Sequence, residues 1–243
     1  MSRTAIVIPA FNEAGAIAKV IAAIPAAYAG LVVVVDNNST DSTPEKARAA
    51  GAVVLHEQRQ GYGYACLKGI EYLNAITDKP DIVVFLDGDY ADYPGEMAGL
   101  VKPITEKDYD LVMGSRILGK REKGAMTPWQ LAASRLIMLS IRALYGATFT
   151  DLGPFRAIKF DRLRELGMKE TTYGWTAEMQ IKAAQRGWRI LEVPADYRVR
   201  IGKSKISGTL RGSLVAGYRI AAVILRLRRK TVNEQKDMSG RNG

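Results

Sequence analysis

Two aspartates separated by one glycine, Asp87 and Asp89 around Gly88, are the first residues of this chain whose types and spacing suggest chemistry. They directly follow the apolar run at residues 82–86, which is typical of a strand buried on both faces of a parallel sheet. Open α/β sheets bind ligands at the carboxyl ends of such strands. Two neighbouring carboxylates repel each other, and a divalent cation that also binds phosphate oxygens removes this repulsion. The motif therefore predicts a metal and a nucleotide diphosphate here; a plain Asp-Gly turn is the alternative.

Small and polar residues follow two earlier apolar runs in a similar way. The run at residues 4–8 leads into a turn, and the run at residues 31–35 ends at Asp36. A turn at a strand end presents backbone groups at the mouth of the sheet. The turn residues that are candidates for nucleotide contacts are Pro9, Ala10, Asn12 and Glu13. Helix capping and compensation of the helix dipole are the alternative roles of the last two.

These residues need a sheet that brings several strand ends to one edge. The chain alternates strand and helix patterns, which is typical of βαβ units in a doubly wound, mostly parallel sheet, so we predict an α/β fold. We expect strands at residues 4–8, 31–35, 52–55, 81–86, 110–113, 155–160 and 189–193, and residues 197–200 are a further candidate to pair beside the last of these. We expect helices at residues 14–24, 61–76, 94–104, 129–145, 176–185 and 207–229, and Pro44 suits the first turn of another helix.

The composition fits one globular unit. A chain of 243 residues with 47% hydrophobic residues can fill a complete core. The single cysteine, Cys66, excludes a disulfide framework, and its place in an expected helix favours the core. The single histidine, His56, follows a strand without a recognisable partner, so we expect it at the surface. The N-terminus leads directly into a strand, and we therefore expect no signal peptide and a cytoplasmic location.

Positive charge is concentrated near the C-terminus. The net charge is +10, and residues 198–230 contain no Asp or Glu. Such a segment favours an anionic membrane surface, and no nucleic-acid recognition motif accompanies it. The apolar stretch at residues 214–227 is interrupted by Arg219 and is shorter than the roughly 20 residues that span a membrane. We therefore expect an amphipathic helix in a membrane interface, with a solvated basic helix as the alternative.

Four strings together resemble glycosyltransferase family 2: IPAFNE at residues 8–13, VDNNSTDST at 35–43, GYGYA at 61–65 and DGD at 87–89. They occur in the family's order and at strand ends or turns, and the resemblance covers residues 3–210. Two later strings, DLGPFRA at 151–157 and GKSK at 202–205, are similar to polyprenyl-phosphate sugar transferases of the dolichyl-phosphate type. The resemblance implies a GT-A domain in residues 1–210, followed by a basic amphipathic helix and a disordered tail in residues 211–243.

The resemblance also implies a reaction. An enzyme of this type moves a hexose, with inversion, from a UDP- or GDP-sugar to a polyprenyl phosphate, using Mg²⁺ or Mn²⁺. It acts as a peripheral protein at the cytoplasmic face of the membrane. By this resemblance Asp87 and Asp89 hold the metal. The residues implied to bind the nucleotide sugar are Pro9, Ala10, Asn12, Glu13, Asp36, Gly61, Gly63, Asp87 and Gly88.

Two positions depart from the family's pattern. Tyr62 stands between the two glycines, where the family often has a lysine. Ala91 stands where the polyprenyl-phosphate enzymes often carry a polar metal ligand. Asp92 is the neighbouring candidate for that ligand, and a water molecule is the alternative.

The acceptor decides which residues must act as catalysts. A phosphate monoester has its second pKa near roughly 6, so it is anionic at pH 7 and needs positioning more than deprotonation. Arginine suits this task because it can bind phosphate through two hydrogen bonds. The residues expected at the acceptor phosphate are Arg156, Arg200, Lys203, Ser204 and Lys205. The residues expected to be catalytic are Asp89, Glu178 and Arg116.

Three other functions fit parts of the pattern. With a soluble or lipid hydroxyl as acceptor, Glu178 would be the general base. A noncatalytic nucleotide-sugar-binding protein has no need of Asp87 and Asp89, which are both present. A nucleotidyltransferase also uses a metal and a similar sheet, but the phosphate loop rich in Gly and Lys that we expect near its first strand is missing.

Overall fold

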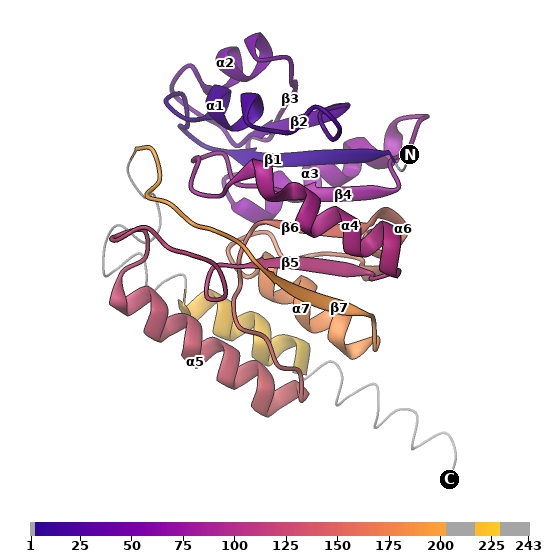
Figure 1. Ribbon diagram of the computed structural model, residues 1–243, viewed down its shortest axis with the longest axis vertical. Helices are drawn as coiled ribbons and strands as arrows, with labels where there is room; N and C mark the ends of the chain where they lie inside the picture. Colours follow the sequence, from indigo (N-terminus) through magenta and orange to yellow (C-terminus); the bar gives the residue numbers. More distant parts are fainter. Residues whose placement is uncertain (1–2, 203–216, 229–243) are drawn as a thin grey trace.

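The computed structural model describes residues 3–202 and 217–228, and it places a seven-stranded sheet between two layers of helices (Figure 1). The strand order is β3-β2-β1-β4-β6-β5-β7. The strands are β1 (Thr4–Ala10), β2 (Leu31–Asp36), β3 (Val53–His56), β4 (Ile82–Phe85), β5 (Leu111–Ser115), β6 (Arg156–Lys159) and β7 (Ile190–Pro194). The helices are α1 (Ile17–Ala22), α2 (Thr43–Ala49), α3 (Tyr62–Ala75), α4 (Met97–Lys107), α5 (Pro128–Tyr145), α6 (Phe160–Leu166) and α7 (Trp175–Gln185), with a short 3-10 helix at Pro94–Glu96 and a further helix at residues 217–228.

The central strands are apolar on both sides because helices cover both faces of the sheet. Along β1, Ala5 and Val7 belong to one hydrophobic cluster, while Ile6 and Ile8 belong to the other. The first cluster takes its helical side chains from α3, α5, α6, α7 and the helix at residues 217–228, and the second from α1, α2 and α4. Successive side chains of a strand point to opposite faces, so such a strand carries no polar alternation. The predicted α/β fold is confirmed.

One strand runs against the others and leaves the functional edge intact. β6 pairs antiparallel with both β4 and β5, whereas β1–β2, β1–β4, β2–β3 and β5–β7 are parallel pairs. The carboxyl ends of β1, β2, β4 and β5 therefore lie at the same edge of the sheet. The loops that follow these strands meet at that edge, on the left of Figure 1.

The structure differs from the predicted elements in three places. α6 was not predicted, although Phe160, Leu163 and Leu166 are buried at helical spacing directly after β6. α1 is shorter than predicted: residues 14–16 form a turn, in which the Ala16 amide donates to the carbonyl of residue 13, and the helix begins only at Ile17. Residues 197–200 form no strand; only isolated bridges link residue 197 to residues 92 and 121.

The helix at residues 217–228 lies against the protein core. Val223, Ile224 and Leu227 are buried in the cluster that also holds α5 and α7. The Tyr145 hydroxyl donates to the Ile224 carbonyl, and Arg226 pairs with Glu170 at 2.7 Å. These three apolar side chains therefore pack inside the protein, while Tyr218 and Leu225 of the same helix are exposed. The predicted domain boundary at residue 211 and the predicted tail lie outside the described residues.

Within the described ranges, no helix is long and apolar enough to cross a membrane.

Candidate functional site

A cavity opens at the carboxyl edge of the sheet, where the loops after β1, β2 and β4 meet. The turn after β1 and the Asp87–Asp89 turn form one side, and the residues around 172 and 200 form another. Its lining residues are Pro9, Ala10, Phe11, Glu13, Asn37, Gln60, Gly61, Tyr62, Ala65, Asp87, Gly88, Asp89, Thr172, Tyr173, Arg200 and Arg219.

The predicted site residues divide into three groups. Those that line the cavity are Pro9, Ala10, Glu13, Gly61, Asp87, Gly88, Asp89 and Arg200. Those that lie elsewhere are Asn12, Asp36, Gly63, Arg116, Arg156 and Glu178. Those outside the described residues are Lys203, Ser204 and Lys205.

The two aspartates of the cavity have different surroundings. Asp89 accepts a hydrogen bond from the Ala91 amide at 2.9 Å, and its other oxygen lies 3.0 Å from the Arg200 guanidinium. Asp87 has a buried Oδ1 that no described residue satisfies with a hydrogen bond of normal geometry. Burial, and then the nearby Asp89 charge, raises the pKa of Asp87 to about 7. An orphaned carboxylate oxygen beside a second carboxylate fits a divalent cation, because the cation supplies the missing partner and removes the repulsion.

Asp92 does not provide a third protein ligand for a metal at this site. Its carboxylate is buried and has no hydrogen-bond partner, and burial raises its pKa well above the usual range. Among the described residues, however, no three His, Cys, Asp or Glu side chains converge closely enough to hold an ion. A metal at Asp87 and Asp89 would take its remaining ligands from phosphate and water, as Mg²⁺ commonly does.

The raised pKa of Asp87 makes a prediction about stability. The folded protein keeps this proton up to about pH 7, while an ordinary carboxyl releases it above 3.8. The free energy of unfolding of the wild type should therefore fall, relative to Asp87→Asn, as pH rises through that window. Urea unfolding in metal-free buffer measures this difference. Asp161→Asn, at a side chain 93% exposed, is the control that should show no trend; a pH-independent difference for Asp87→Asn would contradict the argument.

Asp36 and Asn12 shape the turns around the cavity. The Asp36 carboxylate accepts from the Ser39 amide and lies 3.0 Å from His56 Nδ1, so His56 does have a partner. Asn12 accepts from the Thr40 amide at 2.8 Å and has a φ of 53°. These bonds tie the turn after β1 to the turn after β2. Asp36 and Asn12 thus support the predicted nucleotide site from outside the cavity wall.

Asn37 lines the cavity in place of its neighbour Asp36. Its side-chain amide donates to the carbonyls of Glu57 and Arg59, and its oxygen accepts from the Gly61 amide at 2.8 Å. One side chain therefore fixes the whole loop that leads into α3. The position was overlooked because a run of Asn, Ser and Thr looks like plain turn chemistry in sequence.

Gly61 and Gly63 allow the backbone of residues 170–171 to pack closely against the start of α3. A Cβ on Gly63 would lie 2.2 Å from the Glu170 carbonyl oxygen, and one on Gly61 would lie 2.4 Å from the Thr171 carbonyl oxygen. The Tyr64 amide also donates to Thr171. The glycines therefore seat the 170–173 loop on α3, and this loop contributes Thr172 and Tyr173 to the cavity.

Glu178 is a buried structural carboxylate, which corrects its predicted place beside an acceptor. One oxygen accepts from the amides of Lys169 and Glu170 at 3.0 and 2.7 Å, and the other lies 2.8 Å from Lys182. The side chain is 2% exposed and does not line the cavity. Its partners place Glu178 beneath the 170–173 loop, where it holds the cavity wall.

We expect Glu178→Gln to weaken the fold and to leave the chemistry alone. The change leaves Lys182 partly buried without its counter-ion, which costs roughly 3 kcal/mol for buried pairs. Urea unfolding and the pH profile of kcat are the two measurements, and Lys182→Met is the matched variant that removes the same pair. Loss of a general base costs roughly 100- to 10,000-fold in kcat. A kcat loss of that size with unchanged stability would restore the catalytic role.

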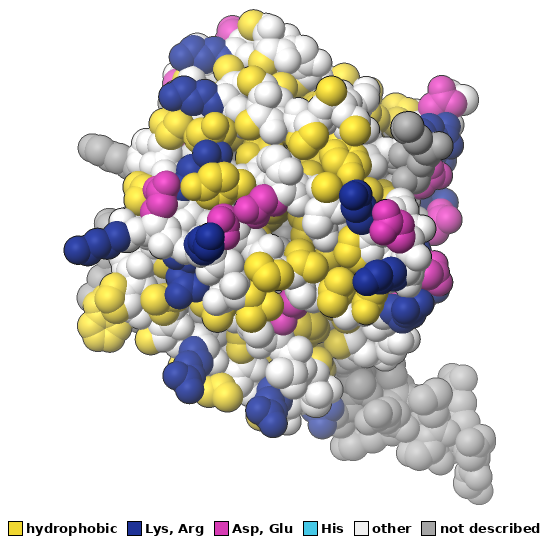
Figure 2. All heavy atoms as spheres, in the orientation of Figure 1, with side chains coloured by type: hydrophobic (Ala, Val, Ile, Leu, Met, Phe, Trp, Pro, Cys, Tyr) yellow, Lys and Arg dark blue, Asp and Glu magenta, His cyan; other side chains and the backbone are white. Residues whose placement is uncertain are grey.

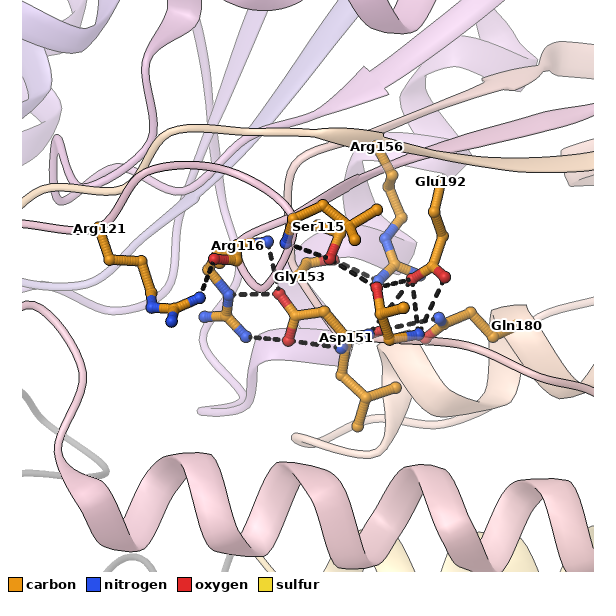
Figure 3. A network of polar contacts seen from close by, with 11 residues as sticks. Ser115, Arg116, Arg121, Asp151, Gly153, Arg156, Gln180 and Glu192 are labelled. Atoms are coloured by element: carbon orange, nitrogen blue, oxygen red, sulfur yellow. Dashed lines mark hydrogen bonds and ion pairs between the residues drawn. The ribbon is translucent and has the colours of Figure 1, made fainter.

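Arg116 and Arg156 are both committed to the loop at residues 150–155 (Figure 3). Arg116 forms a two-pronged bond to Asp151 at 2.7 and 2.8 Å. Arg156 is fully buried and donates to the carbonyls of Gly153 and Thr176, so it cannot reach an acceptor phosphate as predicted. Burial lowers the pKa of Arg156 to about 10. The residues of the DLGPFRA string at 151–157 therefore have a structural role in this part of the fold, and none of them lines the cavity.

The comparisons with known proteins give the family. The sequence profile of glycosyl transferase family 2 matches residues 5–167. The chain belongs to this family. An uncharacterized glycosyltransferase of Mycobacterium tuberculosis is 38% identical over 213 residues, which cover 87% of this chain and 93% of the relative. A dolichyl-phosphate hexose transferase of Haloferax volcanii is 36% identical over 225 residues, covering 91% and 93%. This family 2 chain is therefore a glycosyltransferase, as the sequence predicted.

A solved structure supports the fold. Glucosyl-3-phosphoglycerate synthase from Mycobacterium tuberculosis, crystallised with Mn²⁺, UDP and glucosyl-3-phosphoglycerate, superposes with a TM-score of 0.71 at 24% identity. The match covers 93% of this chain and 79% of the synthase. The synthase has also been crystallised with Mg²⁺ and UDP. The predicted GT-A fold of this family 2 glycosyltransferase is confirmed.

Proposed function

We propose that this glycosyltransferase moves a hexose from a nucleotide diphosphate sugar to a polyprenyl phosphate, with inversion, at the cytoplasmic face of a membrane. The observation that carries the proposal is the meeting of opposite charges in one cavity. Asp87 and Asp89 line it together with Arg200 and Arg219. Carboxylates suit a divalent cation, and guanidinium groups suit phosphate. The name of the Haloferax relative, a dolichyl-phosphate hexose transferase, supports the same acceptor class.

Asp87 and Asp89 would hold Mg²⁺ or Mn²⁺, the ions found with UDP in the synthase. When bound, the ion neutralises negative charge that develops on the departing diphosphate. The protein contributes by holding both carboxylates in the turn directly after β4. The raised pKa of Asp87 means that the ion would displace a proton from this carboxyl at pH values below about 7.

The nucleoside end of the donor would lie against Pro9, Ala10 and Tyr62. Ala10 is small, which lets a flat ring approach the end of β1. Tyr62 replaces the lysine that the family often carries, and its ring contacts the Trp175 ring edge-on with centroids 6.1 Å apart. The hydrogen bonds of Asn37 keep this wall of the cavity in place before the donor arrives.

The acceptor phosphate would be held by Arg200 and Arg219. A phosphate that is anionic at pH 7 attacks the anomeric carbon without giving up a proton, so no general base is required. This agrees with the structure, in which Glu178 is buried away from the cavity. Attack from the side opposite the departing diphosphate inverts the anomeric carbon. A hydroxyl acceptor would need a base that Glu178 does not provide in this arrangement.

The test is a panel of turnover measurements. UDP- and GDP-hexoses are each combined with Mg²⁺ or Mn²⁺ and with one of three acceptors: a short polyprenyl phosphate, the matching polyprenyl alcohol, or 3-phosphoglycerate. We expect turnover with the polyprenyl phosphate alone, and loss of it on chelation of the metal. Turnover with the alcohol would favour a hydroxyl acceptor. Turnover with 3-phosphoglycerate would favour a soluble phosphate-bearing acceptor, as in the synthase.

A further inference from the structure

Helix α5 (Pro128–Tyr145) has a well-defined start and end. The Thr127 side chain accepts from the Gln130 amide, the Gln130 side chain bonds back to the Thr127 amide, and Pro128 occupies the first turn. Gly146 ends the helix with a φ of 69°. Met138 and Ile141 bury its inner side in the core. The orientation of the helix is therefore fixed, and its remaining side chains have a definite outward direction.

The outer side of α5 is apolar and exposed to solvent. Trp129 is 74% exposed, Leu136 is 66% exposed and Leu139 is 53% exposed. Positions 129, 136 and 139 share one face of a helix at 3.6 residues per turn. The smaller exposed residues of the helix are Ala132, Ala133 and Ala143. Contiguous exposed apolar residues of this kind mark a surface that contacts something other than water.

The charges around this surface are all positive along the helix. Arg135 and Arg142 are its only charged residues, and it contains no Asp or Glu. Together with Leu139 they border a groove whose opposite side includes Ile117. The loop before the helix adds exposed Leu118, at 49%. That loop also exposes three basic residues, Lys120, Arg121 and Lys123, and one acidic residue, Glu122.

Helix α5 is connected to the same edge of the sheet at which the cavity opens. The loop before α5 starts at Ser115, at the carboxyl end of β5, and so leaves the same edge of the sheet. Figure 1 shows α5 below the sheet with its beginning toward that edge. In Figure 2, hydrophobic and basic side chains lie together over the region of α5.

We propose that the outer face of α5, with Ile117 and Leu118, docks on an anionic lipid bilayer. Apolar residues enter the acyl boundary, and arginines beside them reach lipid phosphates while their stems stay in the apolar layer. The absence of acidic residues on the helix complements an anionic surface. The surface is formed by one helix and part of one loop. It therefore offers fewer residues than the roughly 20 to 30 a side that a stable protein interface needs. This inference rests on the membrane location in the proposed function and is independent of the acceptor.

Vesicle sedimentation without donor or acceptor tests the proposal. The full chain is mixed with vesicles of phosphatidylglycerol and phosphatidylcholine, and with vesicles of phosphatidylcholine alone. We expect the wild type to bind the anionic vesicles. The double variant Leu136→Glu plus Leu139→Glu should lose roughly tenfold or more in vesicle affinity for each leucine replaced. Leu225→Glu is the matched control, because Leu225 is as exposed as Leu139, at 53%, but lies on the helix at residues 217–228. Binding lost in the control and kept in the α5 variant would overturn the proposal.

Tryptophan fluorescence supplies a readout of insertion. Trp129 is 74% exposed, whereas Trp175 is fully buried and Trp188, the third tryptophan, is half-buried beneath the guanidinium groups of Arg162 and Arg186. Brominated lipids should quench the fluorescence of the wild type, and Trp129→Phe should abolish the quenching while it still sediments with vesicles. A dimer in lipid-free buffer that the α5 double variant abolishes would instead assign the face to a second copy. Turnover with a short acceptor should be unchanged in the double variant, so failure of docking and failure of the proposed reaction give different results.

Discussion

Asp89→Ala is expected to reduce turnover by roughly 1,000-fold or more while the protein stays folded. Asp89 lines the cavity at the end of β4 and carries one of the two charges that would hold the metal. Loss of a metal that contributes several kcal/mol to the transition state corresponds to a rate loss of this size. The folded state should survive because the side chain makes few bonds, to the Ala91 amide and to Arg200. Steady-state turnover, circular dichroism and thermal unfolding are the measurements.

The loss of the Arg200 partner must be separated from the loss of the metal. Asp89→Asn keeps the size of the side chain and removes the charge, and it should lose nearly as much turnover as the alanine variant. Isothermal titration of Mn²⁺ with UDP should show weaker metal binding in both variants. The matched control is Asp161→Ala, an exposed aspartate on α6 whose replacement should leave turnover unchanged. Normal turnover in Asp89→Ala would remove the aspartate from the proposed mechanism.

Gly63→Ala is expected to destabilise the fold by roughly 3 kcal/mol or more. Helix propensity alone predicts the opposite, because alanine in a helix is favoured over glycine by about 1 kcal/mol. The added Cβ would lie 2.2 Å from the Glu170 carbonyl oxygen and 2.6 Å from the Thr171 carbonyl carbon. These are backbone atoms that cannot rotate away, so the cost lies at the upper end of the range for overpacking. Urea unfolding measures it.

The same variant should weaken donor binding, since the displaced loop carries Thr172 and Tyr173 of the cavity wall. Gly99→Ala is the control: Gly99 also lies in a helix, α4, but nothing stands within 4 Å of its Cβ position. That variant should be as stable as the wild type or more stable. If Gly63→Ala also stabilised the protein, the 170–173 loop would not be seated as the structure shows.

The patterns that predicted the fold were local. Apolar runs of four to seven residues ended by polar turns located β1, β2 and β4, because a strand covered on both faces has only one possible pattern. The aspartates at the end of β4 followed from the same reasoning. The spacing of residues in the sequence does not show whether a charged side chain is buried or exposed. Arg156 and Glu178 carry charges that seemed suited to a surface site, yet both are buried by partners distant in sequence.

The cavity residues that were missed share this cause. Thr172 and Tyr173 reach the cavity because two glycines of α3 let their loop approach, a contact across about a hundred residues of sequence. Arg219 appeared only as an interruption of an apolar stretch. Only the packing of the helix at residues 217–228 against the core places it at the cavity. For Asn37, the signal was present in its position next to a strand end.

Glu170 joins parts of the chain that are made at different times. Its side chain bonds to Thr172 and to Arg226, each at 2.7 Å, and its amide bonds to Glu178. Ribosomal synthesis delivers residues 217–228 after every strand of the sheet. The sheet can therefore form while the nascent chain still lacks the helix that braces Glu170 and supplies Arg219 to the cavity. Competence to bind the donor should consequently appear late in biosynthesis, after the scaffold has already assembled.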